Sequence, residues 1–469
     1  MTQIFGLLSI GAGALLSQQR AISVTGNNIA NVNTPGYSRQ RLNMETNMPM
    51  DTPFGSVGMG VHTTTVERVY DRFLGVQMNN ESANLGRWEA QKGALERVEV
   101  VFDESGGYGL NQALSDFWSS WQDLTVNPSG TVERSVVAAK SQALADTIRQ
   151  KHADLGQAQV DIDAAVRSGV EDINRLTAEI SDLNRKIAST EVGGTVNANE
   201  YRDSRDLALK QLSEIIGINS FEDSTGQVVV SVGSGRVLVE NGNSYALTAA
   251  TNAEGHADIV WPDTTGTPVK ISSEIASGKM AGWLHTRDTV IESYKDQLNA
   301  LADNLMTEVN NKHTAGFDLN GAAGIDFFEG SGAAGMLVAQ AILDDPNRIA
   351  AASAAGAAPG DARNAGAIAG LRTALTMGGT GSTPPTSTFD DAANALVSQV
   401  GHDVQVAKSN QSHQADMLTY LDNYRESVSG VNLDEEMVNL VKYQAAYTAA
   451  AKMITMGDEM LNSLMNMIR

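Results

Sequence analysis

The sequence LDEEMVNLVKYQAAYTAAAKMITMGDEMLNSLMNMI, residues 433–468, carries the clearest periodic signal in the chain. Its apolar and aromatic residues recur at strict seven-residue intervals, which places them on one side of an α-helix. Met437, Ala451 and Met465 flank this stripe. One helix cannot bury such a narrow seam alone, so the pattern predicts a helix with a partner. The seam residues are Leu433, Leu440, Tyr447, Ile454, Leu461 and Ile468.

The N-terminal residues repeat this pattern and predict a second helix with an apolar seam. That helix should end in the Asn-rich segment 27–33, because Asn side chains compete with helical backbone hydrogen bonds. Pro35 pushes Thr34 into an extended conformation, and Pro35 followed by Gly36 suits a type II turn. The seam consists of Leu8, Leu15, Ile22 and Ile29, interleaved with Ile4, Gly11, Thr25 and Val32.

Each seam needs a partner helix, either from this chain or from a neighbouring copy. Periodicity alone favours the first arrangement, an ordinary intramolecular helix pair within one globular domain. Association of many copies would bury both seams at roughly 25 cal/mol per Å² of apolar surface. An isolated chain is then expected to leave both ends poorly covered and disordered.

The segment between the two seams predicts a mainly α protein with a β-rich insertion. Helical spacing covers residues 65–102, 109–126, 131–190, 276–312 and 390–467, whereas residues 216–275 alternate like strands between turns. We therefore expect paired terminal helices, a long helical-bundle body and a small outer β domain. Residues 1–64 should form an N-terminal assembly helix with an extended segment, and residues 426–469 a C-terminal assembly helix. The body should consist of a first part (65–215) and a second part (276–425), separated by the β insertion (216–275). Within the second part, the Gly/Ala-rich segment 316–388 should be irregular.

Composition excludes several classes of partner. The net charge of -22 would repel the phosphates of nucleic acids and anionic membrane surfaces. The apolar stretch from Ile4 to Leu16 is too short to span a bilayer, and no Lys or Arg precedes it. We therefore expect neither a membrane anchor nor a cleaved signal peptide. With no Cys, the chain has no disulfide, thiolate metal site or Cys nucleophile.

No residue pattern indicates an active site, so we expect no enzyme, no cofactor and no metal. The histidines form no HExxH pair, and exposed or capping positions are expected for them. Asp318, Asn320 and Gly321 faintly resemble a calcium loop, but the terminal Glu is missing and a turn is the better interpretation. Phe117, Trp118 and Trp121 could form a partner-binding anchor, but we expect them to pack in the core. Several Met residues give the C-terminal helix an adaptable surface for an export chaperone, or simply fill the seam.

Two segments resemble a known family. ISVTGNNIANVNTPGYSRQ, from Ile22 to Gln40, is similar to the N-terminal signature of flagellar rod, hook and hook-associated axial proteins. SGVNLDEEMVNLVKYQAAY, from Ser429 to Tyr447, opens a block running to Leu464 that resembles the C-terminal signature of the same family. The resemblance is strongest to the hook-associated members of the family. It rests on the sequence of residues 24–28, on Ser38, on the long central helices and on the total length.

This resemblance implies a structural subunit of the bacterial flagellum at the junction between hook and filament. It implies export through the flagellar type III channel without a cleavable signal, folding at the growing tip, and an extracellular location. The implied partners are further copies of the chain in a ring or helical oligomer, the hook protein, the second hook-filament junction protein and an export chaperone at the C-terminal helix. The terminal helices would pack in the inner tube wall, with the β domain facing solvent.

Two alternatives remain open at this point. Another axial subunit, such as a hook protein or the second junction protein, would share the terminal seams. A secreted adhesin or enzyme on a coiled-coil scaffold would need its chemistry in the β insertion, where no convergent polar set is found. The residues expected at the assembly interface are Leu8, Leu15, Ile22, Asn28, Ile29, Asn31, Asn33, Pro35, Gly36, Tyr37, Arg39, Leu433, Met437, Leu440, Tyr447, Ile454, Leu461, Met465 and Ile468.

Overall fold

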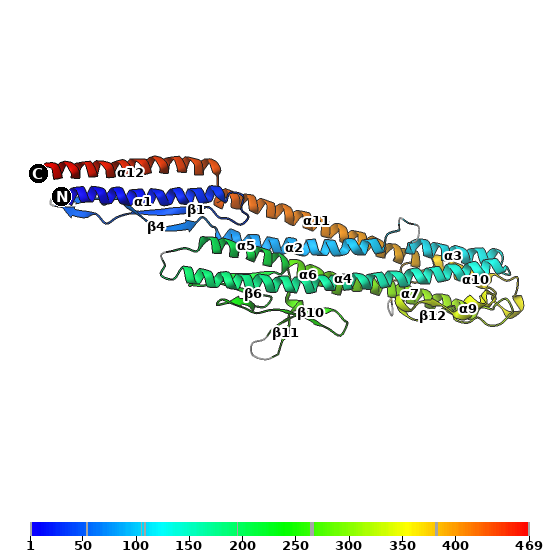
Figure 1. The fold of residues 1–469 in the computed structure, drawn as a ribbon. Coiled ribbons are helices and arrows are strands. Elements are labelled where there is room, and N and C mark those ends of the chain that lie inside the picture. The colour runs from blue at the N-terminus through cyan, green and yellow to red at the C-terminus, as the bar shows by residue number, and fades with distance from the viewer. Residues whose placement is uncertain are drawn as a thin grey trace.

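The chain folds into an elongated molecule with both termini at one end (Figure 1). The structure, a computed structural model, describes residues 2–52, 55–104, 106, 109–194, 196–262, 267–379 and 383–467. At that end α1 (Thr2–Ala30) and α12 (Leu433–Met467) lie side by side, and the other helices form a body that extends away from them. The fold is mainly α with small β-sheets, as predicted.

A β-ribbon follows α1. β1 (Gln40–Thr46) pairs antiparallel with β4 (Val61–Arg68), and a hairpin of β2 (Met50–Thr52) and β3 (Gly55–Val57) extends from them. We refer to α1, this ribbon and α12 together as the terminal unit. Its residues bury little, because one helix pair and a two-stranded ribbon offer few layers to pack.

The helix predicted to start at residue 65 starts later, so that prediction is wrong. Residues 61–68 are rich in Val and Thr, whose branched side chains favour the strand β4. The helix α2 (Arg72–Val101) begins after Asp71, whose carboxylate accepts hydrogen bonds from the backbone N–H groups of Phe73 and Leu74 at 2.9 and 3.2 Å.

The body is a bundle around α4 (Thr131–Thr190), whose 60 residues confirm the long helix predicted there. Apolar residues at helical spacing along α4 are buried by its neighbours, and α11 packs mainly on α2. A π-helical turn, Thr286–Val290, joins α6 to α7. The other long helices of the bundle are α3 (Leu110–Val126), α5 (Asn199–Ile215), α6 (Gly278–His285), α7 (Ile291–Ala315) and α11 (Phe389–Ser429).

The aromatic residues of α3 belong to the core. Phe117, Trp118 and Trp121 are all buried, and the Trp121 ring lies 5.3 Å from that of Phe327 between centroids. The prediction that they serve core packing is confirmed, so they are not an exposed partner anchor.

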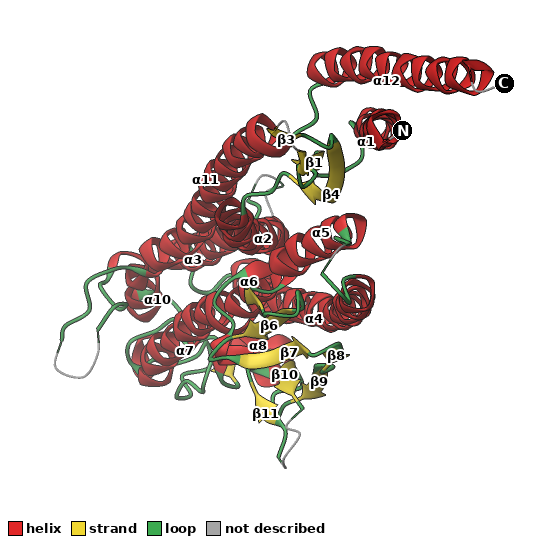
Figure 2. Cartoon of the chain, turned by 90° about the vertical axis from the view of Figure 1, so that its left-hand side faces the viewer, coloured by secondary structure: helices red, strands yellow, loops and turns green. Residues whose placement is uncertain are grey.

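The strands after α5 form two small sheets on one side of α4, away from the terminal unit (Figure 2). Val230 and Val239 on the first sheet pack against Ile173 and Ile180 of α4 in a separate apolar cluster. The strands lie within the β-rich insertion predicted for 216–275. They are β5 (Ile218–Glu222), β6 (Val228–Val232), β7 (Arg236–Glu240) and β8 (Asn243–Ser244), then β9 (Thr248–Thr251), β10 (Ala257–Trp261) and β11 (Val269–Lys270), followed by the 3-10 turn Ser272–Glu274.

The Gly/Ala-rich segment 316–388 is built from short elements that pack against the far end of the body. Arg134 of α4 is buried and holds this segment by donating to the backbone carbonyl of Ile349 at 2.6 Å. Asp318 accepts from the backbone N–H groups of Asn320 and Ala322, which confirms the predicted turn. The elements are β12 (Phe328–Glu329), α8 (Gly332–Gly335), β13 (Leu337–Val338), α9 (Gln340–Asp344), α10 (Arg363–Ala369) and the 3-10 turns Pro346–Arg348, Ala355–Ala357 and Gly370–Thr373.

The helix predicted over 390–467 is interrupted, which corrects that prediction. α11 continues to Ser429, past the expected boundary at residue 426, and α12 starts at Leu433. Gly430 ends the first helix, and the Asn432 side chain accepts from the backbone N–H groups of Asp434 and Glu435 at 3.0 and 3.3 Å. Asn432 therefore caps a new helix rather than continuing the old one.

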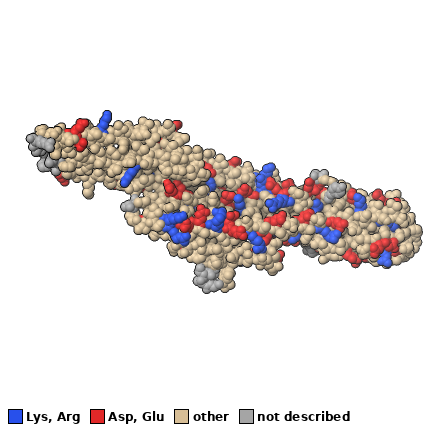
Figure 3. Space-filling view, viewed as in Figure 1, with Lys and Arg blue, Asp and Glu red and all other residues tan. Residues whose placement is uncertain are grey.

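Charge is distributed unevenly along the molecule. Lys, Arg, Asp and Glu are dense on the visible face of the body and sparser on the terminal unit (Figure 3). The sequence of α1 contains one charged residue, Arg20. Among the described residues, no helix is both long and apolar enough to cross a bilayer.

His313 departs from the expectation of exposed histidines, because it is fully buried at the end of α7. One ring nitrogen, Nδ1, lies 2.5 Å from the carbonyl oxygen of Ile325, and Nε2 accepts from the backbone N–H of Ala350 at 2.9 Å. This arrangement requires a neutral ring with its proton on Nδ1. Burial lowers the pKa of His313 from 6.5 to about 4.

The protein should lose stability as pH falls from about 6.5 to about 4. In that window the unfolded chain binds a proton at His313 that the folded chain excludes, which costs up to about 3 kcal/mol. Urea denaturation of the body at pH 7 and pH 4.5 measures this loss. Burial also lowers the pKa values of His152 and His285, so His313→Gln serves as the control and should reduce the loss. An equal loss in that variant would contradict the role of His313.

Candidate functional site

The two terminal helices approach each other closely at glycines. A Cβ atom on Gly11 of α1 would lie 2.9 Å from a side-chain carbon of Ile454, and one on Gly457 of α12 would lie 2.7 Å from Leu8. Larger residues at these two positions would push the helices apart. In a single chain each helix thus covers one side of the other, while most residues of both helices stay half-buried or exposed, in line with the expected poor cover.

The predicted heptad series lies on the buried side of α12, but the residues beside it there differ from those expected. The heptad series from Leu433 is half-buried over most of its length, but its companions are the small residues three positions on, such as Ala450 and Gly457. Met437 and Met465, which the periodicity predicts beside this series, are exposed. The half-buried seam residues are Leu8, Leu15, Ile22, Ile29, Leu440, Tyr447, Ile454 and Leu461, whereas Leu433 is exposed and Ile468 lies outside the described residues.

A polar cluster joins the two helices where α1 ends and α12 begins. The buried Asn28 amide is fully used: Oδ1 accepts from the Tyr37 hydroxyl at 2.8 Å and from the Gln40 backbone N–H at 2.9 Å. Its Nδ2 donates to the Gln40 carbonyl at 2.9 Å and to Glu436 Oε2 at 3.1 Å. We call these residues, with Arg39, the lock.

Glu436 carries a buried negative charge, with 2% of its surface exposed. Arg39 neutralises it through Nε at 2.8 Å and through its NH2 group at 2.7 Å, and also contacts the more exposed Glu435 at 2.9 Å. Asn28 and Glu436 are 408 positions apart in the sequence. The lock therefore ties together the two segments that carry the family resemblance.

The turn after α1 positions Tyr37 and Arg39 for their contacts in the lock. The Tyr37 backbone N–H donates to the Thr34 carbonyl at 3.2 Å, and Gly36 has a φ of 80°, so the predicted type II turn at Pro35 and Gly36 is confirmed. Asn31 holds the last helical turn by donating to the Asn27 carbonyl at 3.0 Å. Asn33 and Pro35 are exposed, so their role is to form the turn rather than to contact α12.

The backbone of Arg39 also connects the terminal unit to the body. Its N–H donates to the Ser429 carbonyl at 3.0 Å, and its carbonyl accepts from the Val69 N–H at 2.7 Å. Residues 429 and 69 lie in the two segments where the chain crosses between terminal unit and body. One residue thus contacts both crossings.

Side chains of α5 support this connection. Asp203 accepts from the Ser38 backbone N–H at 3.0 Å, and Arg68 bridges Asp203 and Asp206 at 3.0 and 2.6 Å. Burial raises the pKa of Asp203 above its ordinary value, although Ser38 and Arg68 both donate to its charged form. The Arg68 guanidinium also lies over the Tyr70 ring.

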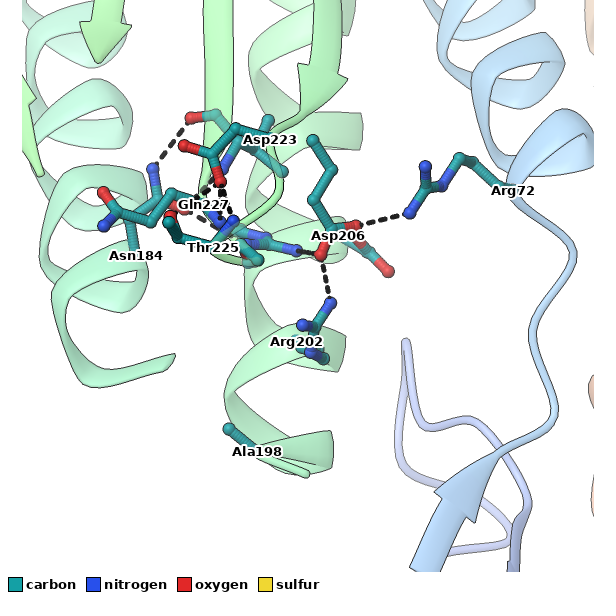
Figure 4. Close-up of polar contacts among 12 residues, drawn as sticks. Arg72, Asn184, Ala198, Arg202, Asp206, Asp223, Thr225 and Gln227 are labelled. Carbon is teal, nitrogen blue, oxygen red and sulfur yellow. Dashed lines mark hydrogen bonds and ion pairs between the residues drawn. The ribbon is translucent and has the colours of Figure 1, made fainter. Parts of the chain in front are cut away.

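A second polar network fixes the first β-sheet next to α5 (Figure 4). Arg72 and Arg202 reach the carboxylate of Glu222 on β5 from different helices, and Arg202 also contacts Glu191 at 2.7 Å. Arg205 donates to Asn184 of α4 at 3.1 Å. The β insertion is therefore held at the same end of the body as the lock.

Sequence reasoning missed Gln40, Arg68, Asp203, Glu435 and Glu436. One signal was available for Glu436, because it lies three positions after Leu433, where a heptad seam expects an apolar residue. A charged residue there needs a buried partner. The identity of that partner, Arg39, depends on the fold.

The described residues favour assembly over chemistry at this site. They contain no group of three His, Asp or Glu placed to hold a metal ion. The outer side of the terminal unit instead exposes large apolar side chains, which mark a surface for another protein. These are Phe5, Leu16, Met48, Met437, Val438, Val441, Met456, Met460, Met465 and Met467.

Removing the buried carboxylate should open the terminal unit. Glu436→Ala leaves Arg39 and Asn28 without their buried partner, at a cost of about 2–4 kcal/mol. The matched control is Glu435→Ala, whose side chain is 57% exposed and should cost less than about 1 kcal/mol. Native-state amide exchange in α1 and α12 measures the free energy of opening. Equal effects of the two substitutions would contradict the lock.

Three family models match successive parts of the chain. The model "Flagella basal body rod protein" matches residues 8–37, and "Flagellar basal body rod FlgEFG protein C-terminal" matches residues 425–467. Between them, "Flagellar hook-associated protein FlgK helical domain" matches residues 95–328. The two terminal matches contain Asn28 and Glu436, which meet in the lock.

Relatives extend the similarity to the whole chain. Flagellar hook-associated protein 1 of Bacillus subtilis (strain 168) is 32% identical, covering 99% of both chains, and that of Escherichia coli (strain K12) is 24% identical, covering 98% of this chain and 99% of the relative. The structure of the flagellar hook junction protein FlgK from Burkholderia pseudomallei shares the fold, with a TM-score of 0.67 and 15% identity over 76% of this chain and 100% of that one. The chain therefore belongs to the flagellar hook-associated protein 1 (FlgK) family.

Proposed function

We propose that this protein is a structural subunit of the bacterial flagellum that forms the junction between hook and filament and assembles through its terminal unit. The full-length similarity to hook-associated protein 1 supports the junction rather than a hook subunit. The observation that carries the assembly mechanism is the locked terminal unit, in which α1 has a single charged residue and the outer side exposes large apolar residues.

The physical reason for assembly lies in the geometry of α1 and α12. Each helix covers one side of the other, and the opposite side of α12 exposes Val438, Val441 and Met456. Contact with neighbouring copies would remove this surface from water. The free energy of association would then become more favourable by roughly 25 cal/mol per Å² of apolar surface buried. We propose that the residues predicted at the assembly interface, from Leu8 to Arg39 and from Leu433 to Ile468, hold the two helices in the arrangement that presents this surface.

The partners follow from the same proposal. The terminal unit would contact other copies of the chain, with the hook protein and the second hook-filament junction protein as neighbours along the axis. The exposed Met residues of α12 would bind an export chaperone before assembly, because unbranched thioether side chains adapt to varied surfaces. Export through the flagellar type III channel, without signal cleavage, would bring the chain to its extracellular place. We propose no catalytic role.

Antibody labelling of isolated flagella should place the protein at the boundary between hook and filament. The label should form one narrow band, because the proposal gives the protein one junction to occupy. Electron microscopy measures the position of the band. Label along the whole hook would instead favour a hook subunit.

A charge on the outer side of the terminal unit should block incorporation. Val441→Glu places a carboxylate at a side chain that is 65% exposed on α12, so the single chain still folds but the buried contact between copies is lost. The matched control, Val192→Glu, alters a side chain that is 81% exposed on the body. Immunoblots of isolated flagella should show the control and lack Val441→Glu. Equal incorporation of both would contradict assembly through α12.

A further inference from the structure

A small cavity opens where the terminal unit meets the body. It has a volume of about 120 Å³ and is lined by the turn after α1, the end of β4, α2, α5, the first β-sheet and the end of α11. We call this cavity the socket. Its apolar wall includes Tyr70, Leu74, Leu209 and Phe221. A cavity of this size suits a single side chain, since cavities of roughly 150 Å³ admit a benzene-sized molecule.

The mouth of the socket is apolar but has cations at its edge. Phe221 is 63% exposed although it lines the cavity, and Tyr70 and Val76 are also exposed there. Arg72, Lys210 and Arg425 lie at the same edge. Each of these cations is paired with a carboxylate, so the socket favours a ligand by its apolar tip rather than by its charge.

The β2–β3 hairpin of the terminal unit has this chemistry. Met48 at its start is 91% exposed, and Met50 and Val57 are exposed beside it. The sequence from Leu42 to Glu67 contains no Lys or Arg, whereas Glu45 and Asp51 flank the Met residues. Met is unbranched and fits irregular cavities well. We call this hairpin the plug.

The plug cannot reach the socket of its own chain. The base of the ribbon is fixed to α1 at Asn28, and its far end is fixed near Ile10, where a Cβ on Gly60 would lie 3.2 Å from the Ile10 side chain. Ile10 and Asn28 are eighteen positions apart on one helix, about 27 Å along its axis. The socket lies beyond the Asn28 end, next to Gly36 and Tyr37, and the plug lies beyond the other.

We propose that the plug of one copy, led by Met48, inserts into the socket of a second copy. This inference rests on the proposed function and deepens it, because it names a contact between copies. The two surfaces differ, so the contact is heterologous and propagates from copy to copy. It offsets neighbouring copies by at least the length of the ribbon in the direction of α1. The lock fixes the distance between plug and socket.

Engineered disulfides test this contact without background, because the natural chain has no Cys. Cells should produce the full chain with Met48→Cys and Phe221→Cys, alongside the unaltered chain, and their flagella should be isolated and oxidised. Disulfide-linked ladders of this chain are expected. The control, Val192→Cys with Phe221→Cys, pairs the socket with an exposed residue outside the plug and should give no ladder. Incorporation of the first variant without linkage would overturn the proposal.

A second measurement does not alter the plug or the apolar wall. Val76→Cys lies at the exposed mouth of the socket, so it can carry a benzophenone maleimide beside the occupant in the isolated flagella. Photolysis and mass spectrometry then identify the occupant. Capture of residues 44–57 of the same chain supports the proposal, and capture of a different protein or of another segment overturns it. Absence of the unaltered chain from the hook-filament boundary would instead refute the proposed function itself.

Discussion

The structure depends on one buried carboxylate. Glu436 lies in the interface between the first and last helices, where an unpaired charge would be very unfavourable. Arg39 and Asn28 satisfy it together, and the amide of Asn28 is in turn aligned by Tyr37 and by the backbone of Gln40. Because each of these groups has its full set of partners, α1 and α12 have one register and not several. That register sets the course of the β-ribbon and the position of α5 through Ser38.

Apolar and charged residues divide the molecule into two parts with different tasks. The body has an aromatic core, a long central helix and a charged surface, as expected of a part that faces water. The terminal unit has a glycine-mediated helix crossing, one charged residue in α1 and exposed Met and Val side chains. A protein that kept such a surface in water would aggregate, so membership in an axial flagellar family gives this surface a natural place.

Much of the fold was predictable because local signals and tertiary packing agree. The 60-residue helix α4, the strands after α5 and the type II turn at Gly36 all have strong local patterns. The sequence predicts that α12 has an apolar seam, but not which residues lie beside that seam. The large residues Met437 and Met465 are expected there, whereas Ala450 and Gly457 occupy those positions. Small residues allow backbones to approach closely, and that advantage appears only when the partner helix is known. The same limit hid the pairing of Glu436 with Arg39, which depends on a contact across the whole sequence.

The backbone of Arg39 contacts both segments that link the terminal unit to the body. A torque applied to the body is therefore divided between two adjacent crossings instead of loading a single tether. The contacts of Ser38 and Arg68 with α5 brace the same junction, so a third element shares the load. The molecule has the layout of a short coupling, in which two helical parts meet at one braced joint.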